Sequence, residues 1–139
     1  MPNSQILIAL NEYGETGIAG TKSNDKILKY FSEIGARWVI DDDTAWCSAF
    51  VNWVLKQAGL PYSSALNARN FLTYGKKTIK PVIGDIVILW RISKTSAFGH
   101  VGFFVKETPT TVFILGGNQN NSVNITAFDK SKVLDYRSF

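Results

Sequence analysis

The spacing of apolar residues changes half-way along the chain. In the first half they recur every three or four positions, which is the period of an amphipathic helix. We expect four helices there: from Ser4 to just before Gly14, from the N-cap Asn24 to Gly35, from about Thr44 to Ala58, and from about Ser64 to Tyr74. The first should bury Ile6, Leu10 and Tyr13, the second Ile27, Leu28, Phe31 and Ile34, and the third Phe50, Val51, Val54, Leu55 and Ala58.

The second half is rich in β-branched and aromatic residues, in short runs divided by Gly, Pro, Asn and Ser. Such runs are typical of strands. They cover residues 85–90, 100–106, 111–116, 123–127 and 133–137. Helices followed by consecutive strands predict an α+β fold in which the N-terminal helices pack on an antiparallel β-sheet.

The composition is that of one globular domain. The 139 residues are 45% hydrophobic and 19% charged, which supplies a single buried core and excludes disordered, collagen-like and coiled-coil chains. Fifteen Lys and Arg against eleven Asp and Glu give a net charge of +4. That balance suits an anionic surface or polymer without identifying one.

The sequence shows no targeting or membrane segment. The apolar run Ile6–Leu10 follows no basic region and lacks a small-residue cleavage site, so a signal peptide is not predicted. No stretch approaches the roughly 20 apolar residues of a membrane span. We therefore expect a protein made in the cytoplasm, which would act outside it only after lysis or through a dedicated secretion machine.

The chain contains one Cys and one His. A single Cys excludes an internal disulfide, and together with a single His it cannot complete a structural zinc site. The acidic run Asp41–Asp43 lacks the spacing and the distal Glu of a calcium-binding loop. We predict neither a bound metal nor a cofactor.

Cys47 lies in the first turn of the third predicted helix. There the helix dipole and unpaired backbone N–H groups favour the thiolate, which is the form that attacks carbonyl carbons. The alternative for Cys47 is a small core residue between Trp46 and Phe50, since free Cys is often buried.

His100 is at the start of a predicted strand, and its imidazole could take the proton of a nearby thiol and later protonate a leaving amine. The alternative is a buried His whose hydrogen bonds go to the backbone.

A third group would orient the imidazole. The turn between the strands predicted at 100–106 and 111–116 places His100 opposite Gly117 or Asn118, and a bulge at this point would shift the register. Either Asn118 or Gln119 then lies within reach of the ring, where an amide oxygen can accept from one ring N–H, as in a Cys-His-Asn site. The alternative for residues 118–121 is a polar turn.

Four segments, in this order, resemble the NlpC/P60 and CHAP group of papain-like cysteine peptidases. They are DTAWCSAFVNW at 43–53, PVIGDIV at 81–87, GHVGFFV at 99–105 and LGGNQ at 115–119. The chain is most similar to a small subgroup of single-domain bacterial and phage proteins with W-C-A-A-F-V and G-G-N-Q segments. The similarity covers nearly the whole chain. This chain departs from the sequence pattern of the subgroup at Gly17, where an acidic residue is expected, and at Asn118, where many relatives carry His or Glu.

The resemblance implies a papain-like α+β fold in which residues 1–139 form a single cysteine peptidase or amidase catalytic domain, without a separate wall-binding domain. By position, Cys47 is the nucleophile and His100 the general base and then acid. Asn118 is the orienting residue, with Gln119 as the alternative. Trp46 and Asp43, which precede the nucleophile in the motif, are assigned to substrate binding.

The usual substrate of this group is peptidoglycan, cut at an amide in the stem peptide, at the sugar–peptide link or in a cross-bridge. We therefore expect a peptidoglycan endopeptidase or amidase that acts in the periplasm or cell wall. It would serve as a phage endolysin, an interbacterial effector toxin or a wall-remodelling enzyme. If the protein is an effector toxin, we also expect an immunity protein or an export partner protein.

Two other functions are kept as alternatives. A thiol acyltransferase or transglutaminase-like toxin would use the same residues with an amine in place of water, because acceptor access decides the fate of the acyl-enzyme. A non-catalytic module could stack RNA bases on Phe103, Phe104 and Phe113. The RNP1 pattern is missing, however, because residues 99–101 read Gly-His-Val where its first three residues belong. No nucleic-acid partner is predicted.

Overall fold

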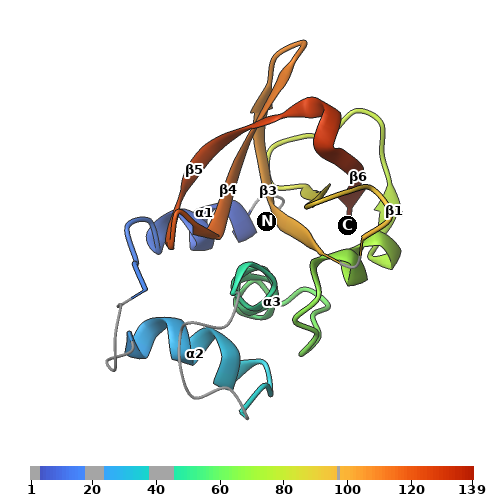
Figure 1. The fold of residues 1–139 in the computed structure, drawn as a ribbon. Coiled ribbons are helices and arrows are strands. Elements are labelled where there is room, and N and C mark those ends of the chain that lie inside the picture. Colours follow the sequence, from blue (N-terminus) through green and yellow to red (C-terminus); the bar gives the residue numbers. More distant parts are fainter. Residues whose placement is uncertain (1–3, 18–23, 38–45, 97) are drawn as a thin grey trace.

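The computed structural model describes residues 4–17, 24–37, 46–96 and 98–139. Within them lie the helices α1 (Ser4–Asn11), α2 (Asp25–Glu33) and α3 (Cys47–Gln57) and the short 3₁₀ helices η1 (Ala68–Thr73) and η2 (Lys130–Lys132). The strands are β1 (Lys76–Lys77), β2 (Ile86–Trp90), β3 (Gly99–Glu107), β4 (Thr111–Gln119), β5 (Ser122–Asp129) and β6 (Val133–Ser138). The predicted α+β architecture is confirmed (Figure 1). In these ranges no helix is both long and apolar enough to cross a membrane.

The sequence predicts the start of α2 correctly but the buried face of α1 only in part. Asn24 caps α2 as predicted, because its side chain accepts from the N–H of Lys26 at 2.8 Å. The predicted apolar face of α1 is confirmed only at Ile6, since Leu10 and Tyr13 are exposed and Gln5 and Ala9 are buried beside Ile6 instead. The Gln5 side chain donates to Gly84 O at 3.1 Å, which turns this side of the helix toward the sheet.

The predicted fourth helix is reduced to the 3₁₀ turn η1. Asn52 of α3 explains the difference, because its side chain donates to Ala65 O at 3.1 Å and accepts from the N–H of Ser63 at 3.0 Å. The first of these bonds occupies the Ala65 carbonyl oxygen, which in a helix starting at Ser64 would accept from the N–H of Arg69. Helical turns therefore begin only after Asn67, whose side chain caps η1.

The strands form one antiparallel six-stranded sheet in the order β1-β6-β2-β3-β4-β5. Strands β2 to β5 follow one another in chain order, whereas β6 returns to pair with β2 and β1. All five predicted strands are confirmed. The short strand β1 was not predicted, because two exposed Lys residues carry no strand pattern.

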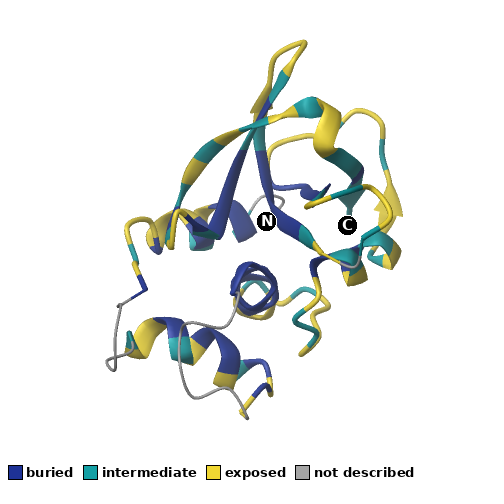
Figure 2. Cartoon of the chain, viewed as in Figure 1, coloured by how far each residue is buried: buried dark blue, intermediate teal, exposed yellow. Residues whose placement is uncertain are grey.

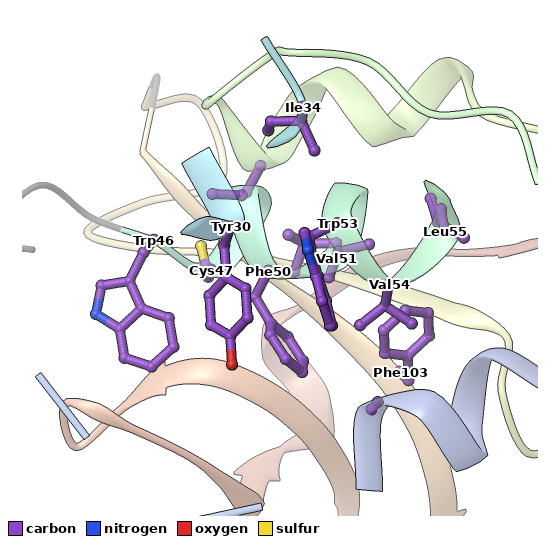
Figure 3. Close-up of a cluster of buried hydrophobic side chains, with 14 of the residues drawn as sticks. Tyr30, Ile34, Trp46, Cys47, Phe50, Val51, Trp53, Val54, Leu55 and Phe103 are labelled. Carbon is purple, nitrogen blue, oxygen red and sulfur yellow. The ribbon is translucent and has the colours of Figure 1, made fainter. Parts of the chain in front are cut away.

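Helix α3 lies between α2 and the sheet (Figure 1) and is buried along nearly its whole length (Figure 2). The Tyr30 ring of α2 packs against Trp46, Phe50 and Trp53, with ring centroids 6.1, 5.3 and 5.0 Å away. Cys47 lies at the Trp46 end of this aromatic row (Figure 3). The row fixes the start of α3 between α2 and the sheet.

The sheet buries side chains on both of its faces. Ile86, Ile88, Val101, Phe103 and Leu115 pack with the helices. The residues that alternate with them, including Leu89, Phe104 and Ile114, form a second cluster on the other face, here called the inner face. Side chains from both β5 and β6, which are not neighbours in the sheet, pack on this second cluster. The sheet is therefore curled around its inner face.

Candidate active site

Cys47 is the first residue of α3. The first backbone bond within the helix runs from Phe50 N–H to Trp46 O at 3.0 Å, so the N–H groups of Cys47 and Ser48 precede the hydrogen-bonded turns. The thiol is therefore placed at the positive end of the helix dipole, as predicted. The helix begins at Cys47 rather than Thr44, and its N-cap, Trp46, makes no side-chain cap bond. Residues 38–45, including the acidic run, lie outside the described residues.

His100, the second residue of β3, contacts the thiol, and both side chains are less than a tenth exposed. Burial alone would raise the pKa of the Cys47 thiol, but the hydrogen bond and charge of His100 outweigh it and lower that pKa. Burial alone would likewise lower the pKa of His100, but its contacts with Cys47 and Gln119 raise it. The Ser48 hydroxyl, 4.0 Å from the sulfur, also favours the thiolate. The pair therefore tends toward thiolate and imidazolium.

The backbone of β3 supplies a further donor to the sulfur. The backbone N–H of Val101 favours the thiolate and so helps to lower the pKa of Cys47. The N–H of Phe104 points toward β2, where it donates to Asp85 O at 2.7 Å. Backbone N–H groups alternate in direction along a strand, so the N–H of Val101, three residues earlier, points toward β4. The regular pairing of β3 with β4 ends at Phe103. The Val101 N–H is thus left out of the ladder and is available to the thiolate.

Gln119 holds the other side of the imidazole. Its Oε1 is 2.9 Å from His100 Nε2, and its own Nε2 donates to the carbonyl oxygens of Ile114 at 3.1 Å and Asn124 at 2.8 Å. Because a carbonyl oxygen can only accept, the amide is fixed with its oxygen toward the ring. His100 Nε2 must therefore carry a hydrogen, and Nδ1 is the nitrogen left to exchange a proton with Cys47.

A one-residue bulge in β4 brings Gln119, the alternative in the sequence analysis, to the ring in place of Asn118. Gly116 lies opposite Asn124 of β5, but Gln119 lies opposite Ser122, so the register shifts between them. Asn118 takes up the shift with a φ of 57°. In a regular strand Asn118 would share the inner face with Ile114 and His100. The bulge reverses the alternation, so that Gln119 is buried beside His100 and Asn118 is half-buried.

Two glycines make room for this arrangement. A Cβ on Gly116 would lie 2.8 Å from Gln119 Oε1. A Cβ on Gly117 would lie 2.7 Å from the Trp46 ring and 2.8 Å from Phe50 Cβ. The glycine pair therefore lets the Gln119 amide reach the imidazole and lets the start of α3 approach the sheet.

Cys47 and His100 lie at the surface of a cleft of about 630 Å³. Cys47, His100 and Gln119 all line it, so the sulfur belongs both to the core and to the cleft surface. A volume of this size suits a short peptide segment. Over the described residues, no three His, Cys, Asp or Glu side chains gather in a group that could hold a metal ion. The chemistry at hand is that of a thiolate, an imidazole and backbone donors.

Residues 39–118, more than half of the chain, match the family model of the CHAP domain. This chain belongs to the CHAP family. CHAP domains are typically hydrolases that act on peptidoglycan, and the α+β fold found here is their papain-like fold. A search among curated proteins finds no match to this chain. The matched range contains Cys47 and His100 and stops one residue short of Gln119.

Of the two residues assigned to substrate binding in the sequence analysis, the structure describes only Trp46. Trp46 is completely buried, with its ring against Tyr30 and beside Gly117. It offers no surface to a substrate, and its assignment is corrected to a packing role. Asp43 lies outside the described residues.

Gly17 is explained by its contact with the turn that follows β4. Its N–H donates to Asn121 O at 2.9 Å, and Asn121 Nδ2 donates to Gly17 O at 3.1 Å. A Cβ at this position would collide with the Asn121 amide. The acidic residue expected here from the family would therefore displace the Asn121 side chain, which lines the cleft.

For the third residue of this CHAP site we predict that Gln119→Ala lowers kcat by about 10- to 100-fold, since it removes the acceptor that orients the imidazole. Asn118→Ala, the matched control one position earlier, should lower kcat much less. A positioning role also predicts a shift in the pH profile. Gln119 helps to raise the pKa of His100, so in Gln119→Ala the alkaline limb of the profile should move to lower pH. Equal losses in the two variants would contradict the assignment of Gln119.

Gly117→Ala should destabilise the domain by about 1–3 kcal/mol, because the added methyl group overpacks the contact with Trp46 and Phe50. Urea unfolding followed by tryptophan fluorescence measures the free energy of unfolding. A change of less than about 0.5 kcal/mol, the range of neutral surface substitutions, would show that α3 does not depend on this close approach.

Proposed function

We propose that this CHAP domain hydrolyses an amide bond in bacterial cell-wall peptide, with Cys47 as the nucleophile. One observation carries the proposal: the buried line of contacts from Cys47 through His100 to Gln119, open to a cleft at the sulfur. A nucleophile, a base that interacts with it and an orienting group hydrogen-bonded to the base form the arrangement needed for acyl transfer. The family match supports peptidoglycan as the polymer.

In the first half of the reaction the Cys47 thiolate attacks the carbonyl carbon of the scissile amide. The backbone N–H of Cys47, together with a neighbouring donor, stabilises the oxygen that becomes negative. His100 then gives its proton to the leaving nitrogen, the C–N bond breaks, and an acyl-enzyme thioester and a free amine result.

In the second half a water molecule attacks the thioester. His100 Nδ1 takes a proton from the water, the C–S bond breaks, and a carboxylic acid and the Cys47 thiolate are released. Throughout, the Gln119 oxygen holds Nε2–H, so the same nitrogen, Nδ1, serves in both halves. Each turnover consumes one water and needs no cofactor.

The proposal extends to the setting of the reaction. The enzyme would be made in the cytoplasm and act in the periplasm or cell wall as a lysin, an effector toxin or a remodelling enzyme. If it is a toxin, an immunity protein would cover the cleft, because a blocked thiol cannot react. The bond cut is an amide of the stem peptide, of a cross-bridge or of the sugar–peptide link.

Mass spectrometry of purified peptidoglycan after digestion tests the proposal. We expect fragments that have gained one water at each cut, with new amine ends for an endopeptidase or stem peptides freed from glycan for an amidase. Cys47→Ala is the control and should release none. Intact peptidoglycan after treatment with folded wild-type protein would overturn the proposal. Products joined to an added amine, without hydrolysis, would favour the acyltransferase alternative.

A further inference from the structure

The two walls of the catalytic cleft differ in charge. On one side, the end of β4 and the turn that leads to β5 contribute the neutral amides of Asn118, Asn120 and Asn121. On the other side, Arg91 follows β2 and Lys132 ends η2. Among the described residues that line the cleft, none is Asp or Glu. The cleft thus has a polar wall suited to peptide groups and a cationic wall.

Arg91 is available to a ligand and lies near the reacting atoms. Its side chain is exposed and forms no ion pair or hydrogen bond with another described residue. Its charge acts on His100, whose pKa it lowers against the larger influence of Cys47. The guanidinium is therefore within electrostatic reach of the pair that performs the reaction.

The loop that carries Arg91 is held in one conformation by many hydrogen bonds. The carbonyl oxygen of Arg91 accepts from the Ser93 N–H at 2.7 Å and from the Ser96 hydroxyl. Arg69 of η1 donates to three carbonyl oxygens of the same loop, those of Ser93, Lys94 and Phe98, at 2.8–3.0 Å. Ile92 is kept at a φ of 70°, which a β-branched residue adopts only where its surroundings impose it. The loop therefore presents Arg91 from a fixed backbone.

Lys132 adds a second positive charge to the same wall. Its Nζ lies 5.6 Å from the centroid of the Trp90 ring, which holds the ammonium beside the cleft. The acidic group that interacts with Lys132 is Asp129, which accepts from the N–H of Ser131 and does not line the cleft. Among the described residues that line the cleft, none therefore cancels the positive charge of this wall.

We propose that Arg91, assisted by Lys132, forms a subsite for a carboxylate of the substrate. A guanidinium binds a carboxylate through two parallel N–H···O bonds, and such a pair fixes orientation as well as adding affinity. The inference rests on the proposed function for the identity of the ligand, a wall peptide with a free carboxyl group near the amide that is cut. It predicts that the enzyme prefers anionic over amidated stem peptides.

Alkylation of Cys47 tests the subsite without any wall substrate. Iodoacetate and iodoacetamide react alike, since the thiolate forms a C–S bond and iodide leaves, but only iodoacetate carries a carboxylate. The ratio of their rates therefore cancels the reactivity of the thiol. We expect Arg91→Gln to lower the iodoacetate-to-iodoacetamide ratio by about 3- to 10-fold, the effect of one charge at close range in a partly screened cleft. Lys132→Gln should lower it less, and Arg91→Lys, which keeps the charge but loses the two parallel N–H donors, should retain only part of it.

Arg37→Gln and Lys80→Gln are the matched controls, because both remove one exposed positive charge outside the cleft. Neither should change the ratio, and about 1 M NaCl should reduce the wild-type preference by screening. An equal ratio in wild type and Arg91→Gln would overturn the subsite, whether or not the protein hydrolyses peptidoglycan.

Digestion of modified walls identifies the anion. We expect Arg91→Gln to lose about 10-fold in kcat/KM on peptidoglycan with free carboxyl groups and to match wild type on peptidoglycan whose carboxyl groups have been amidated with carbodiimide and ammonia. Removing wall phosphate polymers with hydrofluoric acid should leave the difference unchanged. A difference that disappears with the phosphate, or that persists after amidation, would overturn the carboxylate assignment.

Discussion

Cys47→Ala is expected to fold normally and to release no fragments from peptidoglycan. The substitution removes the only group in the cleft that can form the thioester, so no slower route through the same intermediate remains. Only one sulfur atom is lost from a partly open site, and we expect a cost in the free energy of unfolding of about 1 kcal/mol. Thermal unfolding and circular dichroism check the fold, and a turbidity assay on wall suspensions checks activity.

Cys47→Ser is the companion variant. It keeps the size and a nucleophilic atom but loses the easily formed thiolate, since a hydroxyl remains protonated in this environment. Activity at least 1000-fold below wild type is expected, in line with the loss of about 10³ or more on removal of a catalytic group that acts as part of a unit. A folded Cys47→Ala protein with wild-type hydrolysis would end the assignment of the nucleophile.

His100→Ala should be as severe as Cys47→Ala, because residues that act as a unit do not make additive contributions. Without the imidazole, none of the described residues that interact with the sulfur is a base that can take its proton or protonate the leaving amine. Burial, the largest influence on the thiol, raises the pKa of Cys47, so in the variant the thiol should remain protonated at neutral pH. The double variant Cys47→Ala/His100→Ala should be no worse than either single one.

Because His100 is buried beside Phe128, with ring centroids 5.2 Å apart, its removal also opens a space in the inner face. His100→Gln, which leaves a polar side chain of similar reach, separates this packing effect from the loss of the base. Both variants should be inactive, although His100→Gln should unfold at the higher temperature. Substantial hydrolysis by a folded His100→Gln protein would contradict the role of the imidazole.

The regular elements were predictable where local signals are strong. The N-cap residue Asn24 predicts the start of α2, and runs of β-branched and aromatic residues predict five of the six strands. The pairing of β6 with β2 could not be predicted, because the contact joins segments far apart in sequence and leaves no periodic trace. The fourth helix was overestimated for a similar reason, since Asn52, a residue of another helix, binds the Ala65 carbonyl oxygen that the predicted helix would have used.

At the candidate site, Cys47 and His100 could be chosen from the sequence because they are the only residues of their types in the chain. The third residue depended on register, and register is what a sequence specifies least. The bulge at Asn118 exchanges the two faces of β4 and so selects Gln119. A signal was present, because the Gly116–Gly117 pair that precedes Asn118 invites such an irregularity. Which of Asn118 and Gln119 the irregularity turns toward His100 could be seen only in the structure.

The misplaced assignment of Trp46 has a different cause. Neighbours of a nucleophile in sequence need not be neighbours in the cleft, because successive residues at the start of a helix point in different directions. Cys47 directs its sulfur to the cleft, whereas Trp46 enters the core against Tyr30. The cleft residues that sequence analysis missed, such as Arg91 and Lys132, follow other elements and carry no motif of their own.

The central claim is that Cys47 and His100 form a reactive thiolate–imidazolium pair, and the pH dependence of Cys47 alkylation by iodoacetamide tests it most directly. Because the pKa of Cys47 is lowered and that of His100 is raised, the pair is charged between those two pKa values. The single Cys makes one mass shift report one residue. Native protein should therefore react at about pH 6 faster than a free thiol, whose pKa is about 8.5, and His100→Ala should abolish this advantage. Slow labelling that accelerates only in denaturant, or a profile indifferent to His100, would contradict the account.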